Sequence, residues 1–355
     1  MSFPHPIPMQ STKGDMTSTN SNDSKPPGMS GQDQTACAHP RPQFKSQFNT
    51  SDYISGDKFV VGFCNNCRLT VTTPVPASGE LSRYYPQTYY GSGRRFPHVV
   101  EWLLDILYDF RAGTIGAGRE PGKVLDIGCG RGLLLNKLKE KGWDPQGTEL
   151  SEDAAAYARD RLNLPVTTET LEDAHFPNNE FDLVILWHVL EHVPDPRETL
   201  REVARVLKPG ATLLVAVPNF GSLEARSSGP GWFHLDVPRH LTHFTFQSLG
   251  EALRGVGLDV DKASYISLEY DFFSFVQTTQ NKLGLRHNLL YNLLRTRSAK
   301  VLDAEGKSSS AGISQSLLAL ATAIPLGCMS LLYTPLVALL HRGATMTVYA
   351  VKRKN

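Results

Sequence analysis

The chain has 355 residues, a formal net charge of +1 and a hydrophobic share of 41%, which fits one large or two modest globular domains. No basic patch or stripe stands out, so we expect no nucleic-acid partner. The five cysteines are scattered and odd in number, which is unlike a disulfide framework and indicates a reducing compartment. No basic-then-apolar signal peptide opens the sequence, and we therefore expect a cytoplasmic protein.

The N-terminal part divides into a tail and a small module. Residues 1–36 are rich in Ser, Thr, Asn, Pro and Gly, so we expect a disordered tail. Residues 37–95 form a Cys-containing module in which Cys64 and Cys67 have the C-x-x-C spacing of half a zinc knuckle. The upstream half would be Cys37–His39 (CAH), one residue short of the usual spacing. A structural zinc on Cys64 and Cys67 and a knuckle folded without metal therefore both stay open.

The centre of the chain predicts a strand, a glycine turn and a helix. Val99–Phe110 has a helical apolar face, and Lys123–Ile127 is a short apolar run that reads as a buried strand. Three alternate glycines follow, which let the main chain turn tightly and let a ligand approach it. The next helix offers unpaired N–H groups at its start. This order predicts a nucleoside cofactor held by Asp126, Gly128 and Gly130.

A second strand ends at Gly147–Leu150 (GTEL) and places Glu149 about 20 residues after Asp126, where an acid binds ribose hydroxyls. The turn is spaced G-x-G-x-G, whereas the dinucleotide fingerprint is G-x-G-x-x-G. The third strand and its loop lie in Val166–Phe176. Phe181–Trp187 is apolar on both faces, so we predict a central fourth strand.

Titratable groups follow the fourth and fifth strands. His188, Glu191 and His192 would share one face of a helical turn; they could bind a metal or act on a substrate, or Glu191 and His192 could brace the loop. After the fifth strand, Ala211–Val217, the loop Gly229–Phe246 is rich in aromatic and titratable residues and is interpreted as a substrate lid. We expect catalytic roles for His188 and, from this loop, His240, because a histidine of ordinary pKa can accept a proton from a hydroxyl.

A long insertion separates the sixth strand, Leu258–Leu268, from the last, Thr345–Val351. Leu317–Leu340 is uncharged and long enough to cross a bilayer. A single crossing would put the last strand on the wrong side of the membrane from its own sheet, and Pro325 and Pro335 can break the run. We therefore prefer a shallow hairpin or an in-plane helix. The alternatives for 269–343 are peripheral membrane contact and a buried cap or homodimer.

Two stretches carry a family resemblance. The turn after Asp126 resembles the first motif of the class I S-adenosylmethionine-dependent methyltransferases. Phe181–Gly210, with HVLEHVPDP and RVLKPG, is similar to the ubiquinone-pathway O-methyltransferases. The resemblance covers about Pro97–Leu268 and the last strand. It implies an α/β, Rossmann-like, doubly wound sheet of seven strands with an antiparallel last strand, and S-adenosyl-L-methionine as the cofactor.

The resemblance also implies roles for single residues. The position that meets adenine in related enzymes falls on Thr170, with Leu171 next. A Glu, Glu, His set associated with a divalent cation in the ubiquinone enzymes matches His188, Glu191 and His192. Many bacterial members carry paired C-x-x-C motifs before the catalytic domain, which Cys64 and Cys67 resemble.

The expected organisation has five parts: tail 1–36, module 37–95, methyltransferase core 96–268, hydrophobic helical insertion 269–343 and last strand 344–355. The expected function is methyl transfer from S-adenosyl-L-methionine to a hydroxyl of a small or lipid-like acceptor. One alternative is an inactive, membrane-associated binding protein that keeps the fold, and another is an NAD-dependent dehydrogenase.

Overall fold

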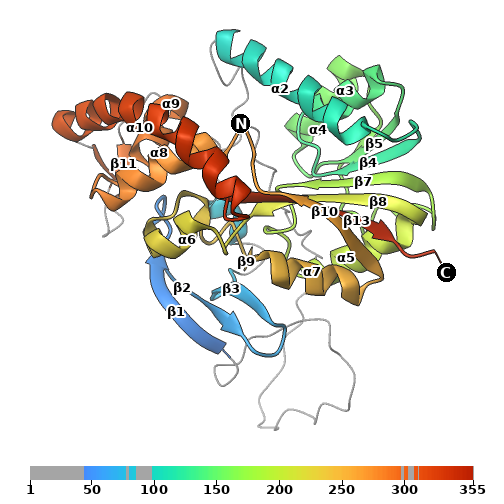
Figure 1. Ribbon diagram of the computed structural model, residues 1–355, viewed down its shortest axis with the longest axis horizontal. Coiled ribbons are helices and arrows are strands. Elements are labelled where there is room, and N and C mark those ends of the chain that lie inside the picture. Colours follow the sequence, from blue (N-terminus) through green and yellow to red (C-terminus); the bar gives the residue numbers. More distant parts are fainter. Residues whose placement is uncertain are drawn as a thin grey trace, which may run out of the picture.

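A seven-stranded sheet forms the centre of the computed structural model, with a small sheet on one side and a helical arm on another (Figure 1). The structure describes residues 44–76, 80–84, 98–296, 300–302, 308–310 and 312–354. The predicted disordered tail and Cys37–His39 lie outside these residues.

The central sheet has the order β10-β13-β8-β7-β4-β5-β6. Its strands are β4 (Lys123–Ile127), β5 (Asp144–Thr148), β6 (Val166–Thr167), β7 (Phe181–Trp187), β8 (Leu207–Pro218), β10 (Leu258–Ser264) and β13 (Thr345–Lys352). Neighbours from β8 to β6 are parallel, whereas β13 is antiparallel to both β8 and β10. The predicted seven-stranded sheet with an antiparallel last strand is confirmed.

Alternate residues of the central strands pack against helices on opposite faces. Leu183 and Ile185 face α2 (His98–Gly116), α3 (Leu133–Glu140) and α4 (Glu152–Leu162). Val184 and Leu186 face α5 (Pro196–Val206) and α7 (Phe246–Gly255). All four side chains are fully buried, as expected for a central strand covered on both faces.

Some element boundaries differ from the predictions. The helix predicted over Val99–Phe110 continues to Gly116. The fifth strand begins at Leu207 rather than Ala211, because Leu207 already pairs with Phe181 of β7. The predicted helical turn at His188–His192 is wrong: this segment is a non-helical turn.

The N-terminal module is a sheet completed by a strand from the core. It consists of β1 (Phe44–Ser51), β2 (Lys58–Cys64), β3 (Leu69–Thr73) and the distant β9 (Thr242–His243), with a 3-10 turn at Leu81–Tyr84. Cys64 and Cys67 flank the turn between β2 and β3 and are both buried. Within the described ranges they join no group of three metal-ligating residues, so zinc on this pair stays a prediction.

The insertion before the last strand forms the helical arm. It contains α8 (Asp271–Lys282), α9 (Leu289–Thr296), the short strands β11 (Lys300–Leu302) and β12 (Ser308–Ser310), and α10 (Ile313–Leu339). Helix α10 is continuous through Pro325 and Pro335. The hairpin expected from the two prolines is therefore wrong, and one long helix packs along α8 instead.

Candidate active site

The glycine turn after β4 separates two cavities of about 430 Å³ each. Gly128 lines both. All six residues predicted to hold the cofactor line one or the other: Asp126, Gly128 and Gly130 the first, and Gly128, Glu149, Thr170 and Leu171 the second. Asp126 is near the carboxyl end of β4, and the other five lie beyond the carboxyl ends of β4, β5 and β6, where open α/β sheets bind ligands.

The turn leaves open space beside Gly130. Gly128, Gly130 and Gly132 all have positive φ angles of 56–72°, which glycine adopts without strain. A Cβ on Gly128 would come within 2.7 Å of Val189, whereas a Cβ on Gly130 would meet nothing within 4 Å. Gly130 also lines the first cavity, so the residues present fit a nucleoside cofactor.

Glu149 is buried against this turn. Its Oε2 accepts a hydrogen bond from the Gly130 N–H at 2.9 Å, and its Oε1 accepts one from the Ser151 N–H at 2.7 Å. Each carboxylate oxygen has a second lone pair, so the side chain keeps acceptor capacity for ribose hydroxyls. The two backbone bonds fix the orientation of the carboxylate.

Asp126 and Arg111 face each other across the first cavity. Burial raises the pKa of Asp126 to about 8, although the Arg111 guanidinium acts in the opposite direction. Arg111 forms an ion pair with Glu269 and lies 3.7 Å from the centre of the Trp187 ring. Arg111 was not predicted as a site residue from the sequence. What the sequence shows is a single cation directly after the apolar stretch Val99–Phe110.

The predicted adenine contact lies on the second cavity together with an acid. The Thr170 hydroxyl donates to Asp173 Oδ2 at 2.8 Å. Glu172 lines the cavity, where its Oε1 accepts from Thr199 at 3.0 Å. Glu172 is thus an acid of this loop near the position, Thr170 and Leu171, at which the family resemblance implies the adenine contact.

His188 is buried beside the first cavity. It has a positive φ of 55°, its Nδ1 lies 3.1 Å from Glu191 Oε1, and its ring centre is 4.3 Å from that of Tyr270. Burial lowers the pKa of His188 to about 3. The ordinary histidine pKa expected from the sequence is therefore wrong for this residue, because a buried cation loses its hydration.

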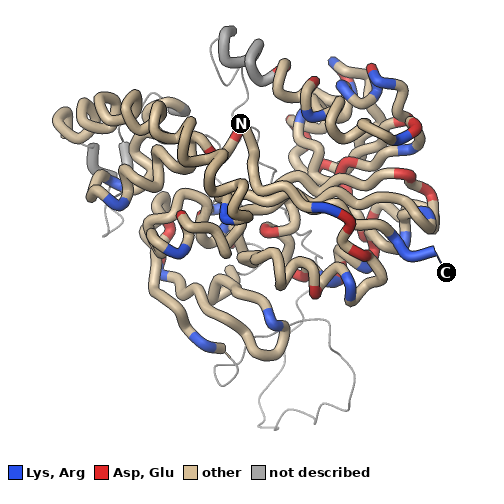
Figure 2. The backbone as a smooth tube through the Cα atoms, in the orientation of Figure 1, with Lys and Arg blue, Asp and Glu red and all other residues tan. Residues whose placement is uncertain are grey.

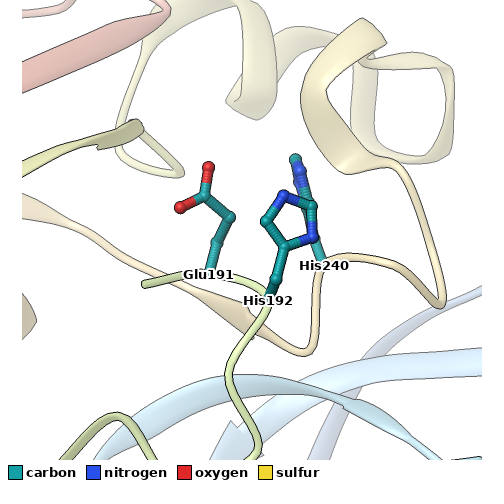
Figure 3. Close-up of side chains that lie close together, drawn as sticks. All are labelled: Glu191, His192 and His240. Atoms are coloured by element: carbon teal, nitrogen blue, oxygen red, sulfur yellow. The ribbon is translucent and has the colours of Figure 1, made fainter. Parts of the chain in front are cut away.

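Glu191, His192 and His240 come together although they lie far apart in the chain (Figure 3). Their ligand atoms all lie within 4.8 Å of one another, and all three side chains are buried. The Glu191 carbonyl accepts hydrogen bonds from the Leu241 and Thr242 N–H groups, at 2.8 and 3.1 Å. The backbone of Glu191 thus braces the loop, while its side chain belongs to the cluster.

The loop Gly229–Phe246, interpreted from the sequence as a substrate lid, is packed into the protein. It follows α6 (Leu223–Ser228) and contains two short 3-10 helices, Gly229–Gly231 and Phe233–Leu235. Trp232 and Arg239 are almost completely buried. Burial would raise the pKa of Asp236, but the Arg239 guanidinium lowers it to about 2. Arg239 also pairs with Asp52 of the N-terminal module at 2.7 Å.

Comparison with known families agrees with this geometry. Residues 101–263 match the model of a family described as "Methyltransferase domain". Together with the sheet order and the glycine turn, this match supports a class I S-adenosylmethionine-dependent methyltransferase fold over these residues, which are 163 of the 355. The fold and cofactor class predicted from the sequence are confirmed.

More particular relatives are ubiquinone biosynthesis O-methyltransferases. The chain is 35% identical to that of Methylococcus capsulatus over 117 residues, which cover 31% of this chain and 47% of the relative. It is 38% identical to that of Azoarcus sp. over 103 residues, covering 27% and 44%. The chain thus spans about half the length of these relatives.

Solved structures overlap more loosely. A SAM-dependent methyltransferase from Archaeoglobus fulgidus is 20% identical with a TM-score of 0.43, and the overlay covers 70% of this chain and 94% of the other. An overlay of this quality adds nothing to the assignment.

Proposed function

We propose that the protein transfers a methyl group from S-adenosyl-L-methionine to a hydroxyl of a small or lipid-like acceptor. The observation that carries this proposal is the pair of cavities on the glycine turn, with open space beside Gly130 and with buried Asp126 and Glu149 in their lining. S-adenosyl-L-methionine is an adenosine with an amino-acid tail, so its ribose hydroxyls need hydrogen-bond acceptors and its tail needs charged partners. Glu149 lines one cavity, Arg111 and Asp126 line the other, and Gly128 lines both.

Each end of the cofactor has suitable residues. Glu149 would accept the ribose hydroxyls, and Thr170, Leu171 and Glu172 would surround the base. Arg111 would face the cofactor carboxylate, because a buried guanidinium is a strong carboxylate partner. When bound, the cofactor supplies an activated sulfonium methyl, so the protein mainly aligns the acceptor and excludes water.

Two buried histidines lie near these cavities and could act on an acceptor. His188 lies next to Trp187 of the first cavity, and His240 lines a separate cavity of about 270 Å³ with His234, Asp236 and others. A neutral imidazole can accept the hydroxyl proton as the methyl group is transferred. The printed names of the relatives favour an oxygen acceptor.

The helical arm supports a membrane-surface location and a lipid-like acceptor. By length and composition alone, α10 could cross a membrane, yet both of its ends are attached to one domain: it packs on α8 and leads directly into β13. A crossing would separate β13 from its sheet. We therefore place α10 in the plane of the interface, partly immersed, as monotopic helices lie.

The side of α10 that faces the protein carries small and polar residues and one valine. Ala319, Ser330, Thr334 and Val337 are buried, and Gln280 of α8 donates to the Ala319 carbonyl at 2.8 Å. Large apolar side chains point outward, and no charge interrupts the arm at α10 (Figure 2). Small and polar residues inside with leucines outside are typical of helices surrounded by lipid.

The test is a methyl-transfer assay with the full chain. Purified protein is incubated with methyl-tritiated S-adenosyl-L-methionine and a cellular extract of lipids and phenols. We expect label in the organic phase that survives mild alkali, because methyl ethers resist it and methyl esters do not. Cofactor binding without label transfer would favour the inactive binding protein. NADH binding without S-adenosyl-L-methionine binding would favour the dehydrogenase.

A further inference from the structure

We propose that Arg111 and Glu269 form a charged pair that recognises the zwitterionic amino-acid end of the cofactor, with Glu269 as the counter-charge of the ammonium group. This role rests on the proposed function, in which S-adenosyl-L-methionine occupies the site and its carboxylate faces Arg111. Glu269 lies outside the glycine turn, in the segment between β10 and α8. It would decide which cofactor tails the protein accepts.

The pair connects the first cavity to the base of the helical arm. Arg111 lines the cavity, and its Nη2 donates a hydrogen bond to Glu269 Oε2. Only 11% of the Arg111 side chain and 3% of the Glu269 side chain are exposed. The Trp187 ring covers one face of the guanidinium at 3.7 Å, and Glu269 binds one of its edges. The guanidinium is thus held in place, with Glu269 directly beside a group that faces the cavity.

One oxygen of Glu269 is left without a donor. Oε2 is bound by Arg111, whereas Oε1 is buried and has no hydrogen-bond partner among the described residues. An unpaired buried carboxylate oxygen is unfavourable, because it has lost its hydration and gained no bond in return. An ammonium group carries only donors, so the cofactor can supply the missing partner.

The charges of the pair match the charges of a zwitterion. The cofactor tail ends in a carboxylate and an ammonium on the same carbon atom. Buried charges attract and repel strongly, because little water screens them. A tail with the carboxylate alone would be attracted by Arg111 and repelled by Glu269, and a tail with the ammonium alone would meet the opposite situation. Only the zwitterion gains from both members of the pair.

Asp126 lines the same cavity but is less suited to this role. Burial raises the pKa of Asp126 to about 8, so this carboxyl is mostly neutral at neutral pH. Burial alone would lower the pKa of Arg111, but the Glu269 carboxylate holds it above its usual value. A guanidinium has several N–H donors, so Arg111 can keep Glu269 at Nη2 and meet the cofactor carboxylate with its other donors.

The test compares probes that differ only in the charges of the tail. The full chain is titrated by calorimetry at neutral pH with S-adenosylhomocysteine, with its analogue lacking the amino group and with its analogue lacking the carboxylate. We expect the wild type to bind S-adenosylhomocysteine about tenfold or more tightly than either analogue, because each analogue loses hydrogen bonds between charged groups.

Glu269→Gln separates recognition from a structural role, because it keeps the shape of the side chain and removes its charge. We expect S-adenosylhomocysteine to bind about tenfold or more weakly. The analogue without the amino group should bind at least as tightly as it does to the wild type, since its carboxylate no longer meets a like charge. A purely structural loss would weaken all probes alike.

Glu224→Gln is the matched control. Glu224 is a glutamate as buried as Glu269, but it lies on α6, hydrogen-bonded to Ser274, and lines neither cavity of the glycine turn. This variant should keep the wild-type order of the probes and the wild-type ratios between them.

The outcomes distinguish the role of Glu269 from the cofactor assignment. If folded Glu269→Gln keeps the wild-type ratio between S-adenosylhomocysteine and the analogue without the amino group, the role is overturned. Equal affinity of the wild type for these two probes overturns it as well, even where the variant fails to fold. Both results leave the cofactor assignment standing. Binding of none of the probes by the wild type would remove the cofactor assignment and the role of Glu269 together.

Discussion

Glu149 is the residue whose loss should affect cofactor binding most directly. Glu149→Ala removes a buried carboxylate that also holds the Gly130 N–H. We expect S-adenosyl-L-methionine binding to weaken by about 1–3 kcal/mol, measured by calorimetry, because charged hydrogen bonds are lost. Glu152→Ala is the control, since this nearby acid is exposed and pairs with Arg159. Equal affinity of wild type and Glu149→Ala would remove Glu149 from the site.

Glu224 should make stability depend on pH. Burial raises its pKa to about 7 even though Ser274 and Thr278 donate to it. The folded state then holds a proton that the unfolded state releases, so stability falls as pH rises from about 4.5 to 7. Over this range the free energy of unfolding falls by roughly 3 kcal/mol, because one pKa unit corresponds to about 1.4 kcal/mol.

Glu224→Gln has no proton to release, so its melting temperature should fall less than that of the wild type between pH 5 and 8. Glu140→Gln changes an exposed acid on α3 and should keep the wild-type slope. Parallel melting curves of wild type and Glu224→Gln across this range would show that Glu224 carries no such proton.

Single residues were predictable where the signal is local. Asp126 lies at the end of an apolar strand and Glu149 directly follows the next strand, so their places at strand ends could be predicted from the sequence. The cation Arg111 and the partnership of His240 with His192 depend on tertiary contacts between segments far apart in the chain. The low pKa of His188 comes from burial, which its neighbours in sequence do not determine.

At the scale of elements, the junction between α10 and β13 should tolerate no side chain at Gly343. A Cβ there would lie 1.8 Å from the Tyr265 carbonyl oxygen, a backbone atom that cannot move aside. We expect Gly343→Ala to lower the free energy of unfolding by about 3 kcal/mol or more, measured by urea denaturation.

Gly327→Ala provides the comparison within α10. A Cβ at Gly327 meets nothing within 4 Å, so alanine should raise stability by up to about 1 kcal/mol through its helix propensity. A Gly343→Ala variant as stable as the wild type would contradict the close approach of these two segments.

Elements with a strong period were predicted well, and irregular segments were not. The strands β4, β7 and β8 and the helix α5 follow the apolar pattern of their sequences. The loop Gly229–Phe246 is rich in polar and aromatic groups, which suggested exposure, yet ion pairs and hydrogen bonds allow it to be buried. The prolines of α10 suggested a break, but the helix continues through both of them.

At the scale of the whole molecule, α10 should bind lipid. Ile324 and Leu332 are 76% and 80% exposed, and burying such side chains contributes about 1.5–3 kcal/mol each. We expect the wild type to float with phosphatidylcholine vesicles. The double variant Ile324→Glu/Leu332→Glu should reduce the vesicle-bound fraction at least tenfold.

The control pair places the same charges on exposed apolar residues elsewhere, with Val75→Glu and Phe110→Glu. It should float as the wild type does. Failure of the wild type to float, together with a homodimer that the α10 double variant dissociates, would show that a second copy covers this helix instead.

The assembly of the parts was the least predictable level. The module 37–95 was expected as a separate unit, but β9 of the core completes its sheet and Arg239 pairs with Asp52. Two-residue strands such as β9 have too few residues to show a period in sequence. The seven-stranded order was predictable because the family resemblance carries it.

Calorimetric titration of the full chain with S-adenosyl-L-methionine tests the central claim most directly. The account predicts saturable binding with one cofactor per chain, weakened by Glu149→Ala and unaffected by Glu152→Ala. Absence of binding by folded wild-type protein, at cofactor concentrations up to the millimolar range, would contradict it.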